Sequence, residues 1–175
     1  MRKTIGYALF VLLAFLLQTT FFQTSSFSLI APNLLLILTV AFAFMNGKKT
    51  GILLGFFCGI SIDFFYGELL GLYALMYMLI GYINGCFCRI FYEDEIKVSM
   101  VFVGASDLIL NILVYIFQFL LRGRLNFFYY LYHIMLPELI FTVFITLIIY
   151  RPLYKWNHLF ENADMRGSSN QWLRK

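Results

Sequence analysis

Six long apolar stretches dominate this sequence and leave little chain between them. A bilayer has a hydrocarbon core about 30 Å thick, so a helical span requires roughly 20 apolar residues. Of the 175 residues, 62% are hydrophobic and only 13% are charged, which is too apolar for an ordinary soluble domain. We therefore expect an all-α polytopic membrane protein. The predicted transmembrane domain covers residues 1–155, with six spans at about 5–22, 29–45, 51–66, 69–91, 98–121 and 127–150.

The third span, residues 51–66, is the shortest of the six and leaves two alternatives open. It either crosses the bilayer fully, or it is a re-entrant segment that continues into the fourth span. Gly67 and Glu68 favour a tight turn between the two, since glycine and a charged residue are both unfavourable in contact with lipid.

The N-terminus combines two basic residues, Arg2 and Lys3, with a following apolar run, as a secretory signal does. However, the run is longer than the usual 7–15 residues, and residues 18–28 contain no alanine-x-alanine cleavage site. We expect a retained membrane anchor.

The basic residues predict the orientation of the chain. If the N-terminus is cytoplasmic, only Arg122 and Arg124 of the 13 lysines and arginines lie on the outer side of the membrane. The positive-inside rule therefore places both termini in the cytoplasm.

We expect Pro152 to end the last helix, because proline cannot continue the hydrogen-bond ladder. Residues 156–175 are then a polar cytoplasmic tail.

Motifs for catalysis, metal binding or nucleic-acid binding are missing from this sequence. Cys58, Cys86 and Cys88 all lie in apolar stretches, and their spacing suits neither a zinc site nor a disulfide framework. The basic residues are scattered between apolar runs, unlike those of a nucleic-acid-binding face. There is no nucleophile motif, phosphate-binding loop or dinucleotide fingerprint. We expect no enzyme activity, no cofactor, no metal and no nucleic-acid partner.

Small residues recur every fourth position from the third span onward. The series is Gly51, Gly55, Gly59, Asp63, Gly67 and Gly71, and Gly81 and Gly85 form a further pair. Residues four apart lie on nearly one face of a helix, and small ones allow a neighbouring backbone to approach closely. This spacing predicts tight helix packing in the membrane and indicates no chemistry by itself.

Ionisable residues inside the apolar stretches have two alternative explanations. They are Asp63 near the outer end of the third span, Asp107 in the fifth, and His133 and Glu138 in the sixth. A charge at the bilayer centre costs about 2.5–3.5 kcal/mol on insertion scales, so each side chain should face other helices or a wet cavity. The functional alternative is an intramembrane binding or relay site formed by Asp107, Asn111, His133 and Glu138. The alternative we favour is interhelical hydrogen bonding.

Asp107 and Glu138 would lie at similar depth if the fifth and sixth spans pack side by side. Two ionised carboxylates would repel each other there. We expect at least one of them to be protonated or paired with His133.

Two patterns together resemble the MreD family of rod shape-determining membrane proteins. One is the opening Pro32-Asn33-Leu34 of the second apolar stretch. The other is the four-residue series from Gly55 through Asp63 to Gly71. The resemblance is most specific from residue 32 to about residue 85, and the rest of the chain agrees in length and number of spans.

This resemblance implies a non-enzymatic scaffold in the bacterial cytoplasmic membrane. The family belongs to the cell-elongation complex, or elongasome, which supports peptidoglycan synthesis and regulates cell shape. The implied partners are a single-span MreC-like protein, MreB, RodA and a penicillin-binding transpeptidase. The fold it implies is similar to the substrate-binding components of energy-coupling-factor transporters. No catalytic residues are carried over, and Pro32, Asn33, Gly51, Gly55, Gly59, Asp63, Gly67 and Gly71 are motif positions only.

The main alternative is a substrate-binding membrane subunit of a vitamin-type transporter. In such subunits the first span usually carries alanines four apart that contact the coupling subunit. Here the small residues of that span are Gly6, Ala8 and Ala14, and none of them is separated from another by four. A third alternative, a lipid-modifying enzyme, would depend on Asp107 or Glu138.

Overall fold

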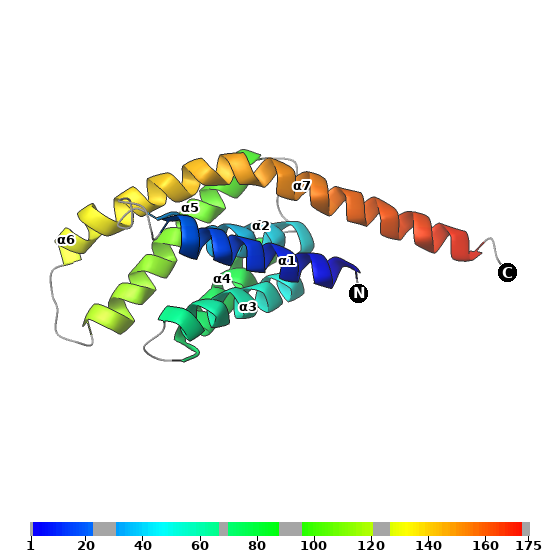
Figure 1. Ribbon diagram of the computed structural model, residues 1–175. Helices are drawn as coiled ribbons and strands as arrows, with labels where there is room; N and C mark the ends of the chain where they lie inside the picture. The colour runs from blue at the N-terminus through cyan, green and yellow to red at the C-terminus, as the bar shows by residue number, and fades with distance from the viewer. Residues whose placement is uncertain (1, 23–30, 67–69, 88–95, 121–126, 173–175) are drawn as a thin grey trace.

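The computed structural model describes residues 2–22, 31–66, 70–87, 96–120 and 127–172, and every regular element within these ranges is a helix (Figure 1). The helices are α1 (Arg2–Leu17), α2 (Leu34–Asn46), α3 (Lys48–Tyr66), α4 (Leu72–Phe87), α5 (Ile96–Val114), α6 (Phe127–Tyr130) and α7 (Leu136–Trp172). Three π-helical turns extend them: η1 (Gln18–Phe22), η3 (Tyr115–Leu120) and η4 (Leu131–Met135). The all-α class expected from the sequence is therefore confirmed.

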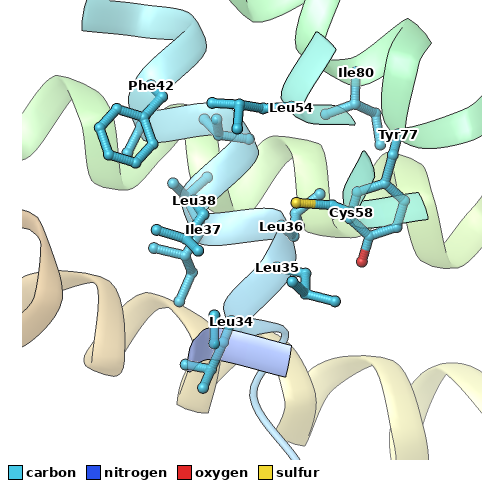
Figure 2. Packing of buried hydrophobic residues seen from close by; sticks show 14 of the residues in the cluster. Leu34, Leu35, Leu36, Ile37, Leu38, Phe42, Leu54, Cys58, Tyr77 and Ile80 are labelled. Atoms are coloured by element: carbon cyan, nitrogen blue, oxygen red, sulfur yellow. The ribbon is translucent and has the colours of Figure 1, made fainter. Parts of the chain in front are cut away.

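Helix α2 forms the centre of the bundle. Every residue from Leu34 to Met45 is buried, and α2 contacts α1, α3, α4, α5 and α7. A helix that is apolar on all sides must be covered on all sides. Figure 2 shows the side chains from Leu34 to Leu38 extending from α2 in several directions, with Cys58 and Tyr77 beside them. Of the predicted second span, 29–45, the helix comprises the part from Leu34 onward.

Helices α3 and α4 run antiparallel and pack on one side of α2, and the run formed by α6, η4 and α7 arches across the other side (Figure 1). Helix α5 packs against both α2 and α7. This arrangement brings α2, α4, α5 and α7 around one buried region.

Helix α7 does not end at Pro152, so that prediction was wrong. The helix continues to Trp172, through most of the predicted tail, and its last part projects beyond the other helices in Figure 1. A proline inside a helix removes one hydrogen bond and crowds the preceding turn, but tertiary packing can hold the helix together. Leu153 and Asn157 are buried, and Asn157 accepts a 3.1 Å hydrogen bond from Asn46 of α2.

The other proline of this helical run, Pro137, lies just after a π-helical turn. The Leu136 N–H donates to the carbonyl of Leu131, five residues earlier. Pro137 has no N–H with which to bond a preceding carbonyl. The wider turn η4 therefore lies where the α-helical ladder is interrupted.

The outer surface of the bundle carries many large apolar side chains. The most exposed include Leu9, Leu53, Phe64, Leu70, Leu75, Val101, Ile140 and Phe144. Two helical stretches, Val98–Phe117 and Leu131–Asn157, are long and apolar enough to cross a membrane, and Gly6–Thr20, Leu34–Asn46 and Leu72–Phe87 are shorter apolar helices. Large exposed apolar surfaces mark contact with a membrane or with other proteins.

Candidate functional site

Glycines bring the backbones of α3 and α4 into direct contact. The positions that meet are Gly51 with Gly81, Gly55 with Tyr77, Gly59 with Ala74, and Gly85 with Lys48. At each of these glycines, an added methyl group would overlap backbone atoms of the other helix. Backbone cannot yield as a flexible side chain can, so positions 51, 55 and 59 of α3 tolerate only glycine. Close backbone approach of this kind favours the association of helices in a bilayer, where the hydrophobic effect does not drive them together.

The last two glycines of the four-residue series differ from the others. Gly67 lies outside the described residues. Gly71 has a φ of 97°, and an added Cβ would meet nothing within 4 Å. Gly71 therefore allows the turn before α4 through its backbone conformation, because residues other than glycine rarely adopt that φ.

Asp63 on α3 caps the start of α4. Its two carboxylate oxygens accept hydrogen bonds from the backbone N–H groups of Tyr73, at 3.0 Å, and Ala74, at 2.8 Å. These N–H groups belong to the first turn of α4, where no intrahelical partner exists and where the helix dipole favours negative charge. Only 1% of Asp63 is exposed, so its charge is compensated by these two donors inside the protein.

Asn33 connects three helices at the start of α2. Its Oδ1 caps α2 by accepting the Leu36 N–H at 3.2 Å, and it also accepts the hydroxyl of Tyr77 from α4 at 2.7 Å. Its own N–H donates to the hydroxyl of Thr142 in α7 at 3.3 Å. Figure 2 shows Tyr77 among the buried residues next to α2. Pro32, also buried, precedes this cap and fixes the direction in which the chain enters α2.

Three of the four predicted intramembrane polar residues come together between α5 and α7. Glu138 of α7 hydrogen-bonds the side chain of Asn111 and lies near enough to Asp107 for the two carboxyl groups to interact. The Asn111 amide also donates to the Asp107 carbonyl at 3.1 Å. Asp107 is fully buried, and within the described residues neither of its carboxyl oxygens has a hydrogen-bond partner.

His133 lies apart from this cluster. Its side chain is exposed and stacks on the ring of Tyr129, with centroids 4.3 Å apart and an interplanar angle of 16°. Pairing of His133 with Asp107 or Glu138, one of the two alternatives expected from the sequence, is therefore not present in the structure. We define the polar cluster as Asp107, Asn111 and Glu138.

Two apolar grooves lie on the outside of the bundle. One, of about 730 Å³, runs between α3 and α4 and is lined by Phe56, Ile60, Leu75 and Leu79 among others. The second, of about 640 Å³, runs between α1 and α3, where Leu12 contributes to its lining. Neither contains Asp107 or Glu138, so the polar cluster and the grooves are separate features.

Several residues that build the interior were not singled out in the sequence. Tyr77 could have been found, since it lies four residues before Gly81 and continues the spacing of that pair. Thr142 carried no signal, because a threonine in an apolar helix usually bonds to its own backbone. The 2.8 Å hydrogen bond from Asn84 of α4 to Ser106 of α5 had no local signature either.

Comparison with protein families decides what this arrangement belongs to. A family model described as rod shape-determining protein MreD matches residues 3–160, nearly the whole chain. The chain belongs to the MreD family. This is a family of membrane proteins associated with rod shape, and the two long apolar helices of the structure fit membrane insertion. No curated protein and no solved structure matches the chain in the corresponding comparisons.

Proposed function

We propose that this MreD-family protein is a non-enzymatic membrane scaffold that binds an MreC-like single-span protein. In this proposal the pair supports peptidoglycan synthesis within the cell-elongation complex, beside MreB, RodA and a penicillin-binding transpeptidase. The observation that carries the proposal is the family match over residues 3–160. It extends over all the packed helices, so the proposal concerns the whole bundle.

The proposal includes six crossings of the bacterial cytoplasmic membrane, with both termini in the cytoplasm. The distribution of basic residues supports this orientation. Exposed leucines and phenylalanines on α1, α3, α4, α5 and α7 support contact with lipid on several sides of the bundle. A bundle similar to the energy-coupling-factor substrate components is part of the same proposal.

A scaffold needs a rigid interior and an accessible face. The backbone contacts between α3 and α4 and the hydrogen bonds of Asn33 supply rigidity. The two outer grooves supply apolar faces against which a single transmembrane helix could pack. Such a role requires shape and no reacting group.

Affinity purification from native membranes tests this function. A tagged chain should recover its MreC-like partner, identified by mass spectrometry. Gly59→Leu should abolish that recovery, because the new side chain would collide with the backbone at Ala74. The matched control is Phe64→Leu on the same helix, at a position that is 78% exposed and lines neither groove, and it should retain the partner. Recovery of an ATPase module in place of cell-wall proteins would favour the transporter alternative.

Photo-crosslinking then locates the face that receives the partner. A crosslinking residue at Leu75 samples the groove between α3 and α4, and one at Leu12 samples the groove between α1 and α3. Both side chains are more than half exposed. A crosslink to the MreC-like protein from one position but not the other assigns the groove, and the absence of crosslinks from both would contradict binding at either.

A further inference from the structure

Asp63 and Asp107 are buried to the same degree but in opposite environments. Asp63 is 1% exposed and Asp107 is 0% exposed. Both oxygens of Asp63 accept backbone N–H groups at a helix start, so its negative charge is stabilised. Within the described residues the oxygens of Asp107 accept nothing. A buried carboxylate without donors or a counter-charge is strongly unfavourable, and it therefore needs another source of compensation.

The groups around Asp107 do not supply that compensation. Glu138 from α7 is a second acid, and Tyr77 from α4 lies near both carboxyl groups. Tyr130 from α6 lies near Glu138. Among the described residues, no lysine or arginine interacts with either acid. The only amide in the cluster, Asn111, interacts with Glu138 and with the Asp107 backbone carbonyl.

We propose that Asp107, which is buried, and Glu138, which is partly buried, form a proton-binding site that holds one proton in the folded protein. Uptake forms one O–H bond on a carboxyl group, with the proton supplied by water. The pair then carries a single negative charge, and the Asn111 amide donates to Glu138. Loss of this proton creates two like charges at close range in a medium of low dielectric.

This site links protonation to the packing of α5 against α7. The two acids stand on these two helices, and the helices also approach closely at Gly104, where an added Cβ would lie 3.2 Å from Val143 Cγ2. Repulsion between the carboxylates therefore pushes apart surfaces that are otherwise in direct contact. A proton-dependent contact of this kind goes beyond the proposed scaffold function and does not require it.

Infrared difference spectroscopy on the full chain in lipid vesicles tests the site directly. At neutral pH the wild-type protein should show one protonated-carboxyl C=O band from the pair. The band should vanish in the double variant Asp107→Asn/Glu138→Gln, and it should be lost or shifted in each single variant. Asp63→Asn is the matched control and should leave the band unchanged, because the Asp63 charge has its own donors. A band unaffected by all Asp107 and Glu138 variants, or no such band, overturns the proposal.

The pH dependence of thermal unfolding provides a second readout. The wild-type unfolding midpoint in detergent should fall as the pH rises above the ordinary carboxyl range, because the unfolded chain then releases a proton that the folded pair still holds. Asp107→Asn keeps the shape of the side chain but cannot become anionic, so its midpoint should lose this fall. Glu138→Gln leaves the buried Asp107 carboxyl in place, so its fall should be smaller than that of the wild type. A wild-type midpoint that does not change with pH, or a fall of equal size in both variants, contradicts the proposal whether or not the protein binds an MreC-like partner.

Discussion

The carboxylate of Asp63 accepts a 2.8 Å hydrogen bond from the backbone N–H of Ala74, the residue that the backbone of α3 meets at Gly59. Gly59 and Asp63 are one turn apart on α3. One glycine therefore permits the close approach of two helices, and the acid one turn later caps the helix that has approached. The single aspartate that follows three glycines in the four-residue series corresponds to the second of these two tasks.

Asp63→Ala should destabilise the start of α4. The change leaves the N–H groups of Tyr73 and Ala74 without their acceptor, and an unsatisfied buried donor costs about 1–3 kcal/mol. Amide hydrogen exchange at α4 should accelerate, and the midpoint of thermal unfolding should fall. Asp63→Asn retains one acceptor oxygen and should show a smaller loss.

Ser61→Ala is the control for Asp63→Ala. The Ser61 hydroxyl donates at 2.8 Å to the Phe57 carbonyl within the same helix. Its removal should change stability by no more than about 0.5 kcal/mol. Equal effects of the two alanine substitutions would contradict the capping role of Asp63.

Gly55→Ala should weaken the contact between α3 and α4. The new methyl group would overlap the carbonyl of Tyr77, and overpacking of this kind typically costs about 1–3 kcal/mol. Gly104→Ala is a matched control in α5, where the methyl group would meet only the tip of Val143 at 3.2 Å. There the gain in helix propensity, about 1 kcal/mol, offsets the crowding. Unfolding midpoints in detergent should therefore fall for the first variant and stay near wild type for the second.

Tyr77→Phe should loosen the junction of α2, α4 and α7. It removes the hydroxyl that donates to Asn33 Oδ1 at 2.7 Å and keeps the ring. A net loss of about 0.5–1.5 kcal/mol is expected for one buried hydrogen bond. Tyr82→Phe alters an exposed residue of the same helix and should have little effect. If both changes have the same effect on unfolding, the Asn33 junction contributes nothing to stability.

Packing between helices that follow each other in the chain could be predicted from the sequence. The four-residue spacing indicated which faces of α3 and α4 could meet, because small residues permit approach whatever the rest of the fold. The pairing of Gly51 with Gly81 could not be derived, since spacing shows the face of a helix and not its register against a neighbour. The same holds for Asn33, whose partners Tyr77 and Thr142 are distant in sequence.

The polar cluster was predictable in part for a similar reason. Apolar flanks indicated that Asp107 and Glu138 face other helices, and the expected packing of their two stretches indicated that they are neighbours; Asp107 is buried and Glu138 is partly buried. The sequence did not indicate that residues 131–135 form the π-helical turn η4. This turn contains His133 and determines the direction of its side chain. The continuation of α7 past Pro152 likewise depends on buried Leu153 and Asn157, which are fixed by tertiary packing.

The orientation with both termini in the cytoplasm predicts which sites a membrane-impermeant thiol reagent reaches from outside. In a variant without the native cysteines, a single cysteine at Arg124 should react in intact cells. One at Lys48 should react only after the membrane is permeabilised, because it follows the second predicted span. The reason is energetic, since moving the basic residues of the inner side across the bilayer is disfavoured. Reaction at Lys48 in intact cells, with protection at Arg124, would invert the orientation and place the Asn33 junction and the Asp63 cap at the cytoplasmic end of the bundle.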